Sequence, residues 1–282
     1  MNWDEALAGW VLHLRVAGVS KLTIRQRRWQ LSTLAATYPD RGPFELTAAD
    51  LLGWLAGRDD WSPETIKSMR SCVRAFFGWA VDGGHITVDP SARLPRVRVP
   101  RAVPRPAKDA TVDRALAGAN DRDKLLILLG SLAGLRAAEI AGLPWDAIDG
   151  GVMRVKGKGG HTRVIPLHPD LAVALAGEQG RREQGRVGSG FRYARDTLNT
   201  YVFPGKRGGM SPQWVSQILS DLLGDATAHM LRHRFASKAY DGSHDLRAVQ
   251  ELLGHTSPMT TAVYTATSDA ALTAAVLAAG AS

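Results

Sequence analysis

The stretch from Leu231 to Tyr264 carries side chains that could act together in one reaction. It reads LRHRFASKAYDGSHDLRAVQELLGHTSPMTTAVY, with an arginine near its start, a histidine near its end, and a tyrosine nine residues after that histidine. A tyrosine hydroxyl can attack a phosphodiester as a nucleophile. The phosphoryl group in transfer must have its charge neutralised, and planar arginine forks do this better than lysines. The stretch therefore predicts phosphoryl-transfer chemistry.

The full candidate set adds residues from other parts of the chain. It comprises Arg136, Lys158, His229, Arg232, His255 and Tyr264. A lysine on a hairpin tip could protonate the leaving sugar oxygen, and a histidine with a near-neutral pKa could take the proton of the nucleophile. Two histidines and a tyrosine with no acid among them make a poor metal cage, so we expect no metal and no cofactor. Each residue alone also has an ordinary structural explanation, as a packed or capping histidine, an ion-paired arginine, a half-buried tyrosine or a solvated turn lysine.

The elements that must position these residues begin with a helical bundle over residues 1–94. Apolar residues from Trp3 to Leu14 recur at steps of three and four, which is typical of one helical stripe. Further helices are predicted over about 23–37, after the capping hydroxyl of Thr47, and over 62–83, where Ser-Pro begins the helix and glycines end it. The first part of the chain is therefore predicted to be all helical.

Residues 95–109 form the predicted boundary between two domains. The segment PRVRVPRAVPRPAK contains four prolines, five basic residues and no acidic residue, so it cannot be helical and should extend. It could be a linker kept solvated by its charge, or a strap that lies along phosphates. Its candidate DNA contacts are Arg96, Arg98 and Arg101.

Residues 110–282 are predicted to form a mixed α+β domain. A helix is expected near 112–119, and the apolar run 125–132 predicts a buried helix just before Arg136. Two β-rich runs, 152–155 and 162–167, flank a glycine-rich turn with Lys158 and predict a hairpin.

Downstream of the hairpin, the pattern changes twice. The stretch 177–196 is rich in glycine and arginine and lacks a period, so we expect a surface loop. Helical patterns return at Ser211 and Pro212, as N-cap and first residue, and continue to an apolar C-terminal helix. The fold class predicted for the whole chain is mainly α with a small β-hairpin sheet.

The amino-acid composition indicates in which cellular compartment the protein acts and what kind of partner it binds. The formal net charge is +8 and 45% of the residues are hydrophobic, which indicates a folded, basic chain with a plausible polyanionic partner. Cys72 is the single cysteine, so no internal disulfide is possible and a reducing compartment is favoured. The N-terminus resembles neither a signal peptide nor a membrane span, so we expect a cytoplasmic protein.

Four motifs together resemble the tyrosine recombinases, or phage-type integrases, across nearly the whole chain. TAHMLRHRFAS is similar to the His-x-x-Arg box of that family, and LLGH is followed by a tyrosine at the distance found in the family. GLRAAEIAGL resembles its first arginine box, and VKGKGGHTRVIPL resembles its β-hairpin. The resemblance assigns catalytic roles to Arg136, Lys158, His229, Arg232, His255 and Tyr264. It assigns supporting roles to Glu139 and His233, and makes Lys156 the less favoured register for the lysine.

The resemblance also implies an architecture and a reaction. It implies a C-shaped clamp on DNA, with a helical core-binding domain at 1–94, the linker at 95–109, and a catalytic domain with a C-terminal helix at 110–282. Tyr264 would form a 3′-phosphotyrosyl link that conserves the bond energy, so no ATP is required. The expected partners are double-stranded recombination sites, on which four copies pair two duplexes, whereas the free protein is a monomer or weakly associated. The chain begins directly with the core-binding bundle, which is typical of a simple integrase without an arm-binding domain.

Several alternatives stay open at this point. Integration or excision of a phage or mobile element is the first choice, and resolution of chromosome dimers, as by Xer recombinases, is the second. A DNA-binding regulator that keeps the fold without the reaction, or a type IB topoisomerase, would belong to another class. The apolar C-terminal helix could pack on its own domain or on a neighbouring copy.

Two helix faces of the first domain are candidates for DNA contact. They carry Arg25, Arg27 and Arg28 on the second predicted helix, and Lys67, Arg70 and Arg74 on the fourth. The simpler interpretation of the same residues is a pair of solvated helix faces.

Overall fold

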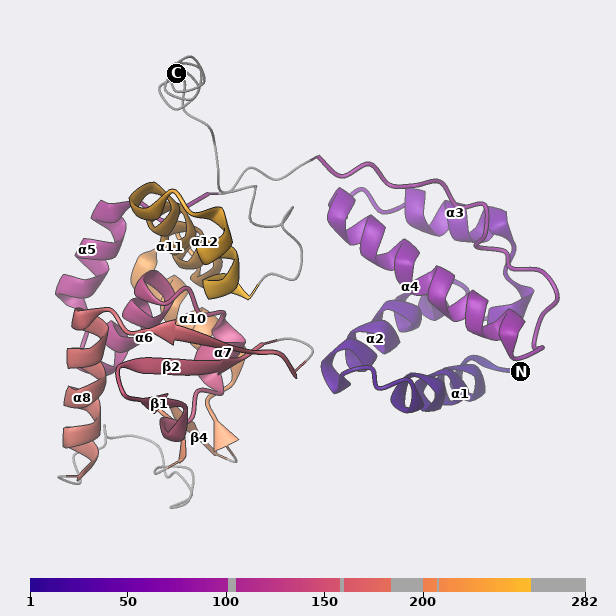
Figure 1. Ribbon diagram of the computed structural model, residues 1–282. Coiled ribbons are helices and arrows are strands. Elements are labelled where there is room, and N and C mark those ends of the chain that lie inside the picture. Colours follow the sequence, from indigo (N-terminus) through magenta and orange to yellow (C-terminus); the bar gives the residue numbers. More distant parts are fainter. Residues whose placement is uncertain (101–104, 158–159, 184–199, 207, 255–282) are drawn as a thin grey trace, which may run out of the picture. The chain divides into compact units, whose positions relative to one another are not determined.

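The computed structural model describes residues 1–100, 105–157, 160–183, 200–206 and 208–254. The chain separates into two compact units, Met1–Ala102 and Val103–Ser282. Helices dominate both units, and the sheets are small (Figure 1). The predicted class, mainly α with a small β-hairpin sheet, is confirmed. Within the described ranges, no helix is long and apolar enough to cross a membrane.

The first unit is built from four α-helices and a short 3-10 turn. They are α1 (Trp3–Val16), α2 (Lys21–Thr37), η1 (Pro43–Glu45), α3 (Ala48–Ala56) and α4 (Pro63–Asp82). The side chains of Asn2, Ser20, Thr47 and Ser62 each accept a hydrogen bond from the backbone N–H three residues later, and so begin the four α-helices. Ser20 explains why the second helix begins slightly earlier than its apolar pattern predicts.

The core of the first unit is aromatic. Phe76 of α4 is fully buried, with its ring centroid 5.4 Å from that of Trp10 and 5.2 Å from that of Phe77. These large rings hold α1 against α4, because each buries a large apolar area at a small cost in side-chain entropy. The polar face of α4 is thereby fixed toward the surface.

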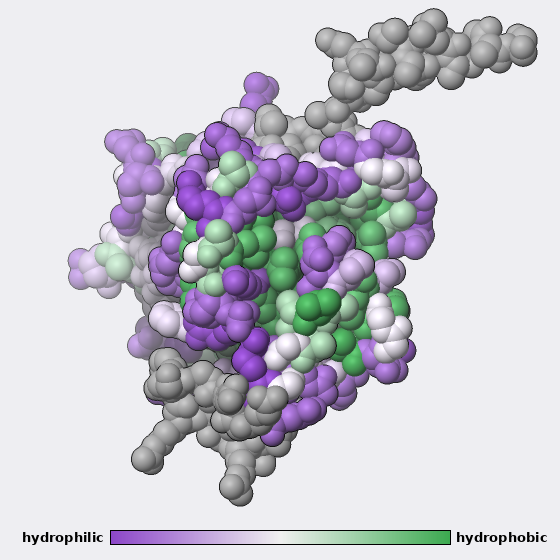
Figure 2. All heavy atoms as spheres, turned by 90° about the vertical axis from the view of Figure 1, so that its left-hand side faces the viewer, coloured by the Kyte–Doolittle hydropathy of each residue, from purple (hydrophilic) through white to green (hydrophobic). Residues whose placement is uncertain are grey.

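The described part of the second unit contains helices, a hairpin and three strands of two residues each. In chain order they are α5 (Asp109–Gly118), α6 (Asp121–Leu132), α7 (Ala137–Ala141), η2 (Trp145–Ala147), β1 (Ile148–Asp149), β2 (Val152–Lys156), β3 (Thr162–Pro166), α8 (Pro169–Glu183), β4 (Pro204–Gly205), β5 (Gly208–Gly209), α10 (Pro212–Leu223), α11 (Ala228–Ser243) and α12 (Leu246–Leu253). The predicted buried helix is α6, which packs against α8 and α11. Figure 2 shows the face on the side of α5 and α8, where hydrophobic surface lies between hydrophilic rims.

The predicted hairpin supplies β2 and β3 of a three-stranded antiparallel sheet of order β1-β2-β3, in which β2 is the central strand. Its register pairs Lys156 with Thr162 and Val152 with Pro166. Side chains alternate along β3, so that Ile165 faces the core and Val164 faces outward. Position 163 lies on the same face as Ile165.

The prediction of a loop over 177–196 is wrong for its first part, 177–183, which is helical. Residues up to Glu183 continue α8, although the sequence there is rich in glycine. Arg181 and Arg182 both bind the carboxylate of Glu178, and Arg182 also donates to the backbone carbonyls of Tyr201 and Val202. These contacts outweigh the low helix propensity of glycine. Residues 184–199 lie outside the described part.

The end of the basic, proline-rich segment is attached to α11. The backbone N–H of Ala107 donates to the carbonyl of Met230 at 3.0 Å. Two residues later, the carboxylate of Asp109 accepts from Arg234 at 2.8 Å and from Lys238 at 2.7 Å. The last residues of this segment therefore belong to the second unit.

The turn between α6 and α7, which leads into Arg136, lies against α11. Gly134 has a φ of +62°, a conformation that favours glycine. A Cβ placed on Gly134 would lie 2.4 Å from the Phe235 ring, and one placed on Gly130 would lie 2.8 Å from Leu231. Two glycines thus allow the close approach of α6 and its turn to the helix that carries Arg232.

We predict that Gly134→Ala destabilises the protein by about 2 kcal/mol or more, because it combines a left-handed backbone with a clash in the core. Gly180→Ala in α8 is the matched control, since nothing lies within 4 Å of its added Cβ. The free energy of unfolding of Gly180→Ala should rise by about 0.5–1 kcal/mol, because alanine has a higher helix propensity than glycine. Urea unfolding of the full chain, followed by circular dichroism, compares the two. Equal stabilities would contradict the packing described for the turn.

Candidate active site

Arg136 is placed by the short helix that follows the turn. It is the N-cap residue of α7, and its backbone N–H donates to Glu139 Oε2 at 2.9 Å. The Arg136 guanidinium bends back and donates to Glu139 Oε1 at 2.9 Å. The arginine side chain remains 39% exposed while that of Glu139 is 6% exposed. One end of Arg136 is therefore fixed, and the remainder faces solvent.

Arg232 lies deeper, in the first turns of α11. Its side chain is 1% exposed. The guanidinium donates to the carbonyl oxygen of Gly134 and to that of Leu253. A buried charge is tolerated only with such partners. Arg232 thereby joins the turn before α7 to the last residue of α12.

Glu139 is the centre of this arrangement. Arg163 of β3 binds it through two hydrogen bonds of 2.8 Å, one to each carboxylate oxygen. Arg232 Nη1 lies 3.9 Å from Glu139 Oε2. Burial acts to raise the pKa of Glu139, but the hydrogen bonds and charges of Arg163 and Arg136 outweigh it and lower the pKa below its usual range. The carboxylate is therefore ionised at neutral pH.

Among the described residues, three guanidiniums surround this one carboxylate. The cluster of Arg136, Arg163, Arg232 and Glu139 carries an excess of two positive charges. Carbonyl oxygens satisfy donors of Arg163 and Arg232 without neutralising them. Such a site favours an anion, and the exposed side of the Arg136 guanidinium is where a phosphate could approach it.

The two histidines of α11 lie side by side near the arginines. The ring centroids of His229 and His233 are 4.3 Å apart, with an angle of 71° between the rings. Partial desolvation and the charges of Arg232 and Arg136 lower the pKa of His229. Burial, followed by His229 and Arg232, lowers the pKa of His233 to about 4. Neutral imidazole is the form of both at pH 7, and a neutral His229 can accept a proton.

The structure brings together only part of the predicted set. Arg136, His229 and Arg232 converge, together with the supporting residues Glu139 and His233. Lys158, His255 and Tyr264 lie outside the described residues. The chain is described up to Gly157 on the hairpin and up to Gly254 after α12.

Arg163 is the residue of this site that the sequence analysis did not find. The signal was available, because its position in β3 shares the inward face of Ile165. An arginine at an inward position of an alternating strand needs a buried partner. Sequence alone does not identify that partner, since Glu139 is 24 residues away along the chain.

The helix faces of the first unit separate into two kinds. Arg25, Arg28, Lys67 and Arg74 are exposed, as are Arg96 and Arg98, whereas Arg101 lies outside the described residues. Arg27 lies over the Trp10 ring at 5.7 Å, and Arg70 donates to the Leu94 carbonyl at 2.8 Å. Arg70 is thus half-buried, with a structural contact that its helical position did not predict.

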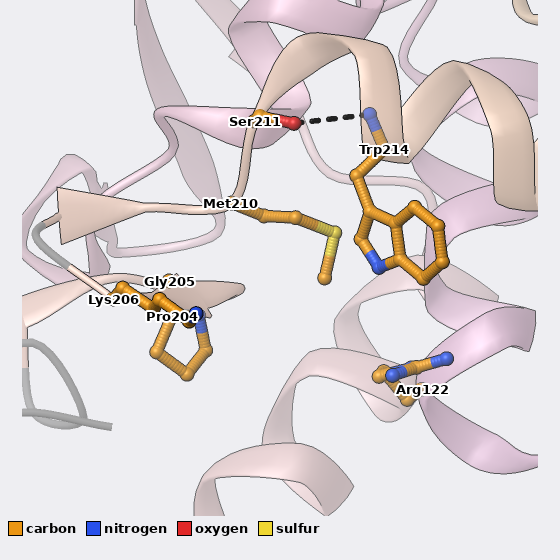
Figure 3. A pocket seen from close by; sticks show the side chains of 7 residues that line it. All are labelled: Arg122, Pro204, Gly205, Lys206, Met210, Ser211 and Trp214. Carbon is orange, nitrogen blue, oxygen red and sulfur yellow. Dashed lines mark hydrogen bonds between the residues drawn. The ribbon is translucent and has the colours of Figure 1, made fainter. Parts of the chain in front are cut away.

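A separate pocket lies at the start of α10. Its volume is about 350 Å³, and it is lined by Arg122, Pro204, Gly205, Lys206, Met210, Ser211 and Trp214. Figure 3 shows the Met210 side chain extending toward the indole of Trp214. It shares no lining residue with the arginine cluster. Within the described ranges, no three histidine, cysteine or acidic side chains gather as a metal site requires.

Comparison with known proteins identifies the family. The family model described as the phage integrase family matches residues 108–271. Tyrosine recombinase XerC of Xanthomonas campestris pv. campestris is 32% identical over 281 residues, which cover 93% of this chain and 84% of the relative. The chain belongs to the phage integrase family, the tyrosine recombinases.

Two other similar proteins extend this finding. Tyrosine recombinase XerC of Corynebacterium efficiens is 34% identical over 267 residues, or 89% of this chain and 82% of the relative. The structure of a lambda integrase dimer bound to a COC′ core site aligns with a TM-score of 0.74, covering 94% of this chain and 77% of that one. At 21% identity, this likeness concerns the fold. The predicted family and fold class are both confirmed.

For this integrase-family chain, we predict that Glu139→Gln lowers the free energy of unfolding by about 3–5 kcal/mol at neutral pH. Removing one partner of a buried ion pair has an effect of that size. Glu251→Gln is the control, because its pair with Arg247 is exposed and contributes at most about 1 kcal/mol. Urea unfolding of both variants measures the difference. A small, equal cost would show that Glu139 does not organise the arginines.

The stability that Glu139 contributes should also depend on pH, which a comparison of wild type with Glu139→Gln can measure. Because the folded-state pKa of Glu139 is lowered, its contribution is complete above the pKa of an unfolded glutamate, about 4.3. It is lost as the pH falls further, through the folded-state pKa. The stability gap between wild type and Glu139→Gln should therefore be constant from pH 7 to about pH 5 and narrow below about pH 4. A gap that widens in acid would reverse the assigned sign.

Proposed function

We propose that the chain is a site-specific DNA recombinase that cleaves and rejoins strands through a 3′-phosphotyrosyl intermediate. The observation that carries the proposal is the convergence of Arg136, His229 and Arg232 in a chain of the phage integrase family. Similar structures include a lambda integrase tetramer bound to a Holliday junction, which supports DNA as the partner.

In the proposed step, the Tyr264 oxygen attacks the phosphorus of a DNA strand. The bond between phosphorus and O5′ breaks, and a 5′-hydroxyl leaves with a proton that Lys158 supplies. The phenolic proton passes to a neutral histidine, for which His229 and His255 are the candidates. The link conserves the energy of the phosphodiester, so the reverse attack by a 5′-hydroxyl rejoins the strand without ATP.

The arginine cluster supplies the electrostatic part of this reaction. Arg136 would bind the oxygens of the phosphoryl group from its exposed side, and Arg232 would add its positive charge from its buried position. The surplus positive charge of the cluster would stabilise the charge that spreads over those oxygens. Glu139 and His233 would orient these groups as supporting residues. No metal or cofactor is assigned a role, because guanidiniums carry the charge that a metal would otherwise neutralise.

The two units suggest separate functions for the two parts of the chain. We assign core-site DNA binding to the helical residues 1–94, a basic linker to 95–109, and catalysis to 110–282 with the C-terminal helix. The assembly proposed is a homotetramer on two paired sites, formed by a protein that is monomeric or weakly associated when free. A cytoplasmic location fits an enzyme that acts on DNA.

Integration and excision of a phage or mobile element is the preferred biological role. Resolution of chromosome dimers is the second candidate, and the observation that favours it is the XerC identity of the similar curated proteins. Recombination assays with paired sites separate the two, because an integrase requires attachment sites and a resolving enzyme joins two copies of one site. A DNA-binding regulator without the reaction is the alternative from another class.

The test of the proposed function is Tyr264→Phe, which removes the attacking oxygen and keeps the ring. Wild-type protein mixed with a nicked target site should give a covalent protein–DNA adduct on a denaturing gel, with excess EDTA present. The variant should bind the site with unchanged affinity and give no adduct. An adduct formed by the variant would show that Tyr264 is not the nucleophile, and no adduct from wild type would support the regulator.

A second test concerns the exposed cations of the first unit. If Arg25, Arg28, Lys67 and Arg74 contact phosphates, each alanine variant should weaken binding and reduce the slope of log K against log salt by about one. Arg41→Ala is the control, because its guanidinium is bound to Asp50 in the same unit. We expect Arg70→Ala to lower stability instead, since Arg70 holds the Leu94 carbonyl. Slopes equal to that of the control would leave these cations as solvated surface.

A further inference from the structure

Arg163 is buried at the junction of three elements that carry the candidate site. Its side chain is 9% exposed. Two of its hydrogen bonds go to Glu139 on α7, and its Nε donates to the carbonyl of Leu252 at the end of α12, at 2.8 Å. A single side chain on β3 therefore connects α7 and α12, which are far apart in the sequence (Figure 1).

The contact with α12 includes more than one hydrogen bond. Gly254 ends this helix with a φ of +63°, and a Cβ placed on it would lie 3.0 Å from Arg163 Cδ. The aliphatic part of Arg163 thus packs against the backbone at the end of the helix. His255 follows Gly254 directly in the sequence.

The base of the hairpin turn lies against the same side chain. Gly157 closes the turn by donating to the carbonyl of His161 at 2.7 Å. A Cβ on Gly157 would lie 3.7 Å from Arg163 Nη1 and 4.0 Å from Glu139 Oε1. Lys158 is the next residue. The arginine therefore lies beside the last described residue before the lysine, and it is hydrogen-bonded to the helix end before the histidine.

From these contacts we propose that Arg163 is a positioning residue for strand cleavage, which aligns Arg136 through Glu139 and fixes the ends of the hairpin and of α12. The proposal rests on the proposed recombinase function. Arg163 does not need to touch DNA, because its donors are directed at Glu139 and Leu252 while Arg136 keeps an exposed side. Its effect on the phosphate passes through its neighbours.

The geometry requires arginine rather than any cation. A planar guanidinium can hold both carboxylate oxygens and a carbonyl at fixed angles, whereas a lysine ammonium is a point charge on a flexible stem. Arg163→Lys would keep the charge next to Glu139 and lose the fixed alignment. It therefore separates positioning from simple charge balance.

The test compares Arg163→Lys with wild type in two assays on the full chain. Binding to the target site is measured by titration, and the rate of covalent adduct formation is measured on a nicked site with enzyme in excess. We expect an unchanged binding affinity and a cleavage rate lower by about 10- to 100-fold, since small misplacement of reacting groups has effects of that size. A residue that only stabilises the fold would not change the rate of the folded, DNA-bound protein.

Arg182→Lys is the matched control. Arg182 is similarly buried, at 11% exposed, and its guanidinium also binds one carboxylate, Glu178, and backbone carbonyls in the same unit. Arg182→Lys should lower the melting temperature about as much as Arg163→Lys does, and it should leave the cleavage rate at the wild-type value. Equal loss of cleavage in both variants would overturn the proposal.

The remaining outcomes are also decisive. If wild type forms no adduct, the proposed function fails and this role fails with it. If wild type cleaves and Arg163→Lys cleaves equally fast, the positioning role alone is wrong. Should Arg163→Lys not fold, Arg163→Gln replaces it, because its amide can still donate to the Leu252 carbonyl. If neither variant folds, Arg163 is a folding residue and the proposal is overturned.

Discussion

The buried carboxylate of Glu139 is the interaction on which the rest of the site depends. A charged group with so little exposure is stable only when it is paired, and Arg163 and Arg136 pair with it from a strand and from its own helix. In return, the carboxylate holds guanidiniums that would otherwise repel each other. Removing Glu139 would release two elements at once, because β3 and α7 meet at its two oxygens.

The second constraint is the close approach of the α6–α7 turn to α11. Gly134 adopts a left-handed conformation that directs its carbonyl to Arg232, and the Phe235 ring occupies the space that a side chain would need. The deepest arginine is therefore held by backbone, whereas the outer one, Arg136, is held by Glu139. This difference explains why one guanidinium is nearly inaccessible and the other faces solvent.

Much of the fold could be predicted from the sequence, because apolar periods and helix caps are local signals. Ser62 with Pro63, and Ser211 with Pro212, begin helices where predicted, and the hairpin strands differ from prediction by a residue at their ends. The continuation of α8 to Glu183 was missed, since it depends on ion pairs and on carbonyls of distant residues. The contacts of Arg163 and Arg70 could not be predicted for the same reason: their partners come from tertiary structure. The family motifs identified Arg136 and Arg232 without revealing that Arg163 joins them.

The end of α12 explains how the cluster keeps its positive charge. Leu252 and Leu253 offer consecutive carbonyls to Arg163 and Arg232, at the helix terminus where the macrodipole favours cations. Carbonyl oxygens satisfy the donors but leave the charges in place, whereas additional carboxylates would cancel them. The surplus charge then remains available to an anion, and the segment leading to Tyr264 starts from a helix end that two of the arginines hold. Charge and position are thus set by the same contacts, which is what the proposed binding of a phosphate and the proposed alignment of its attack would require.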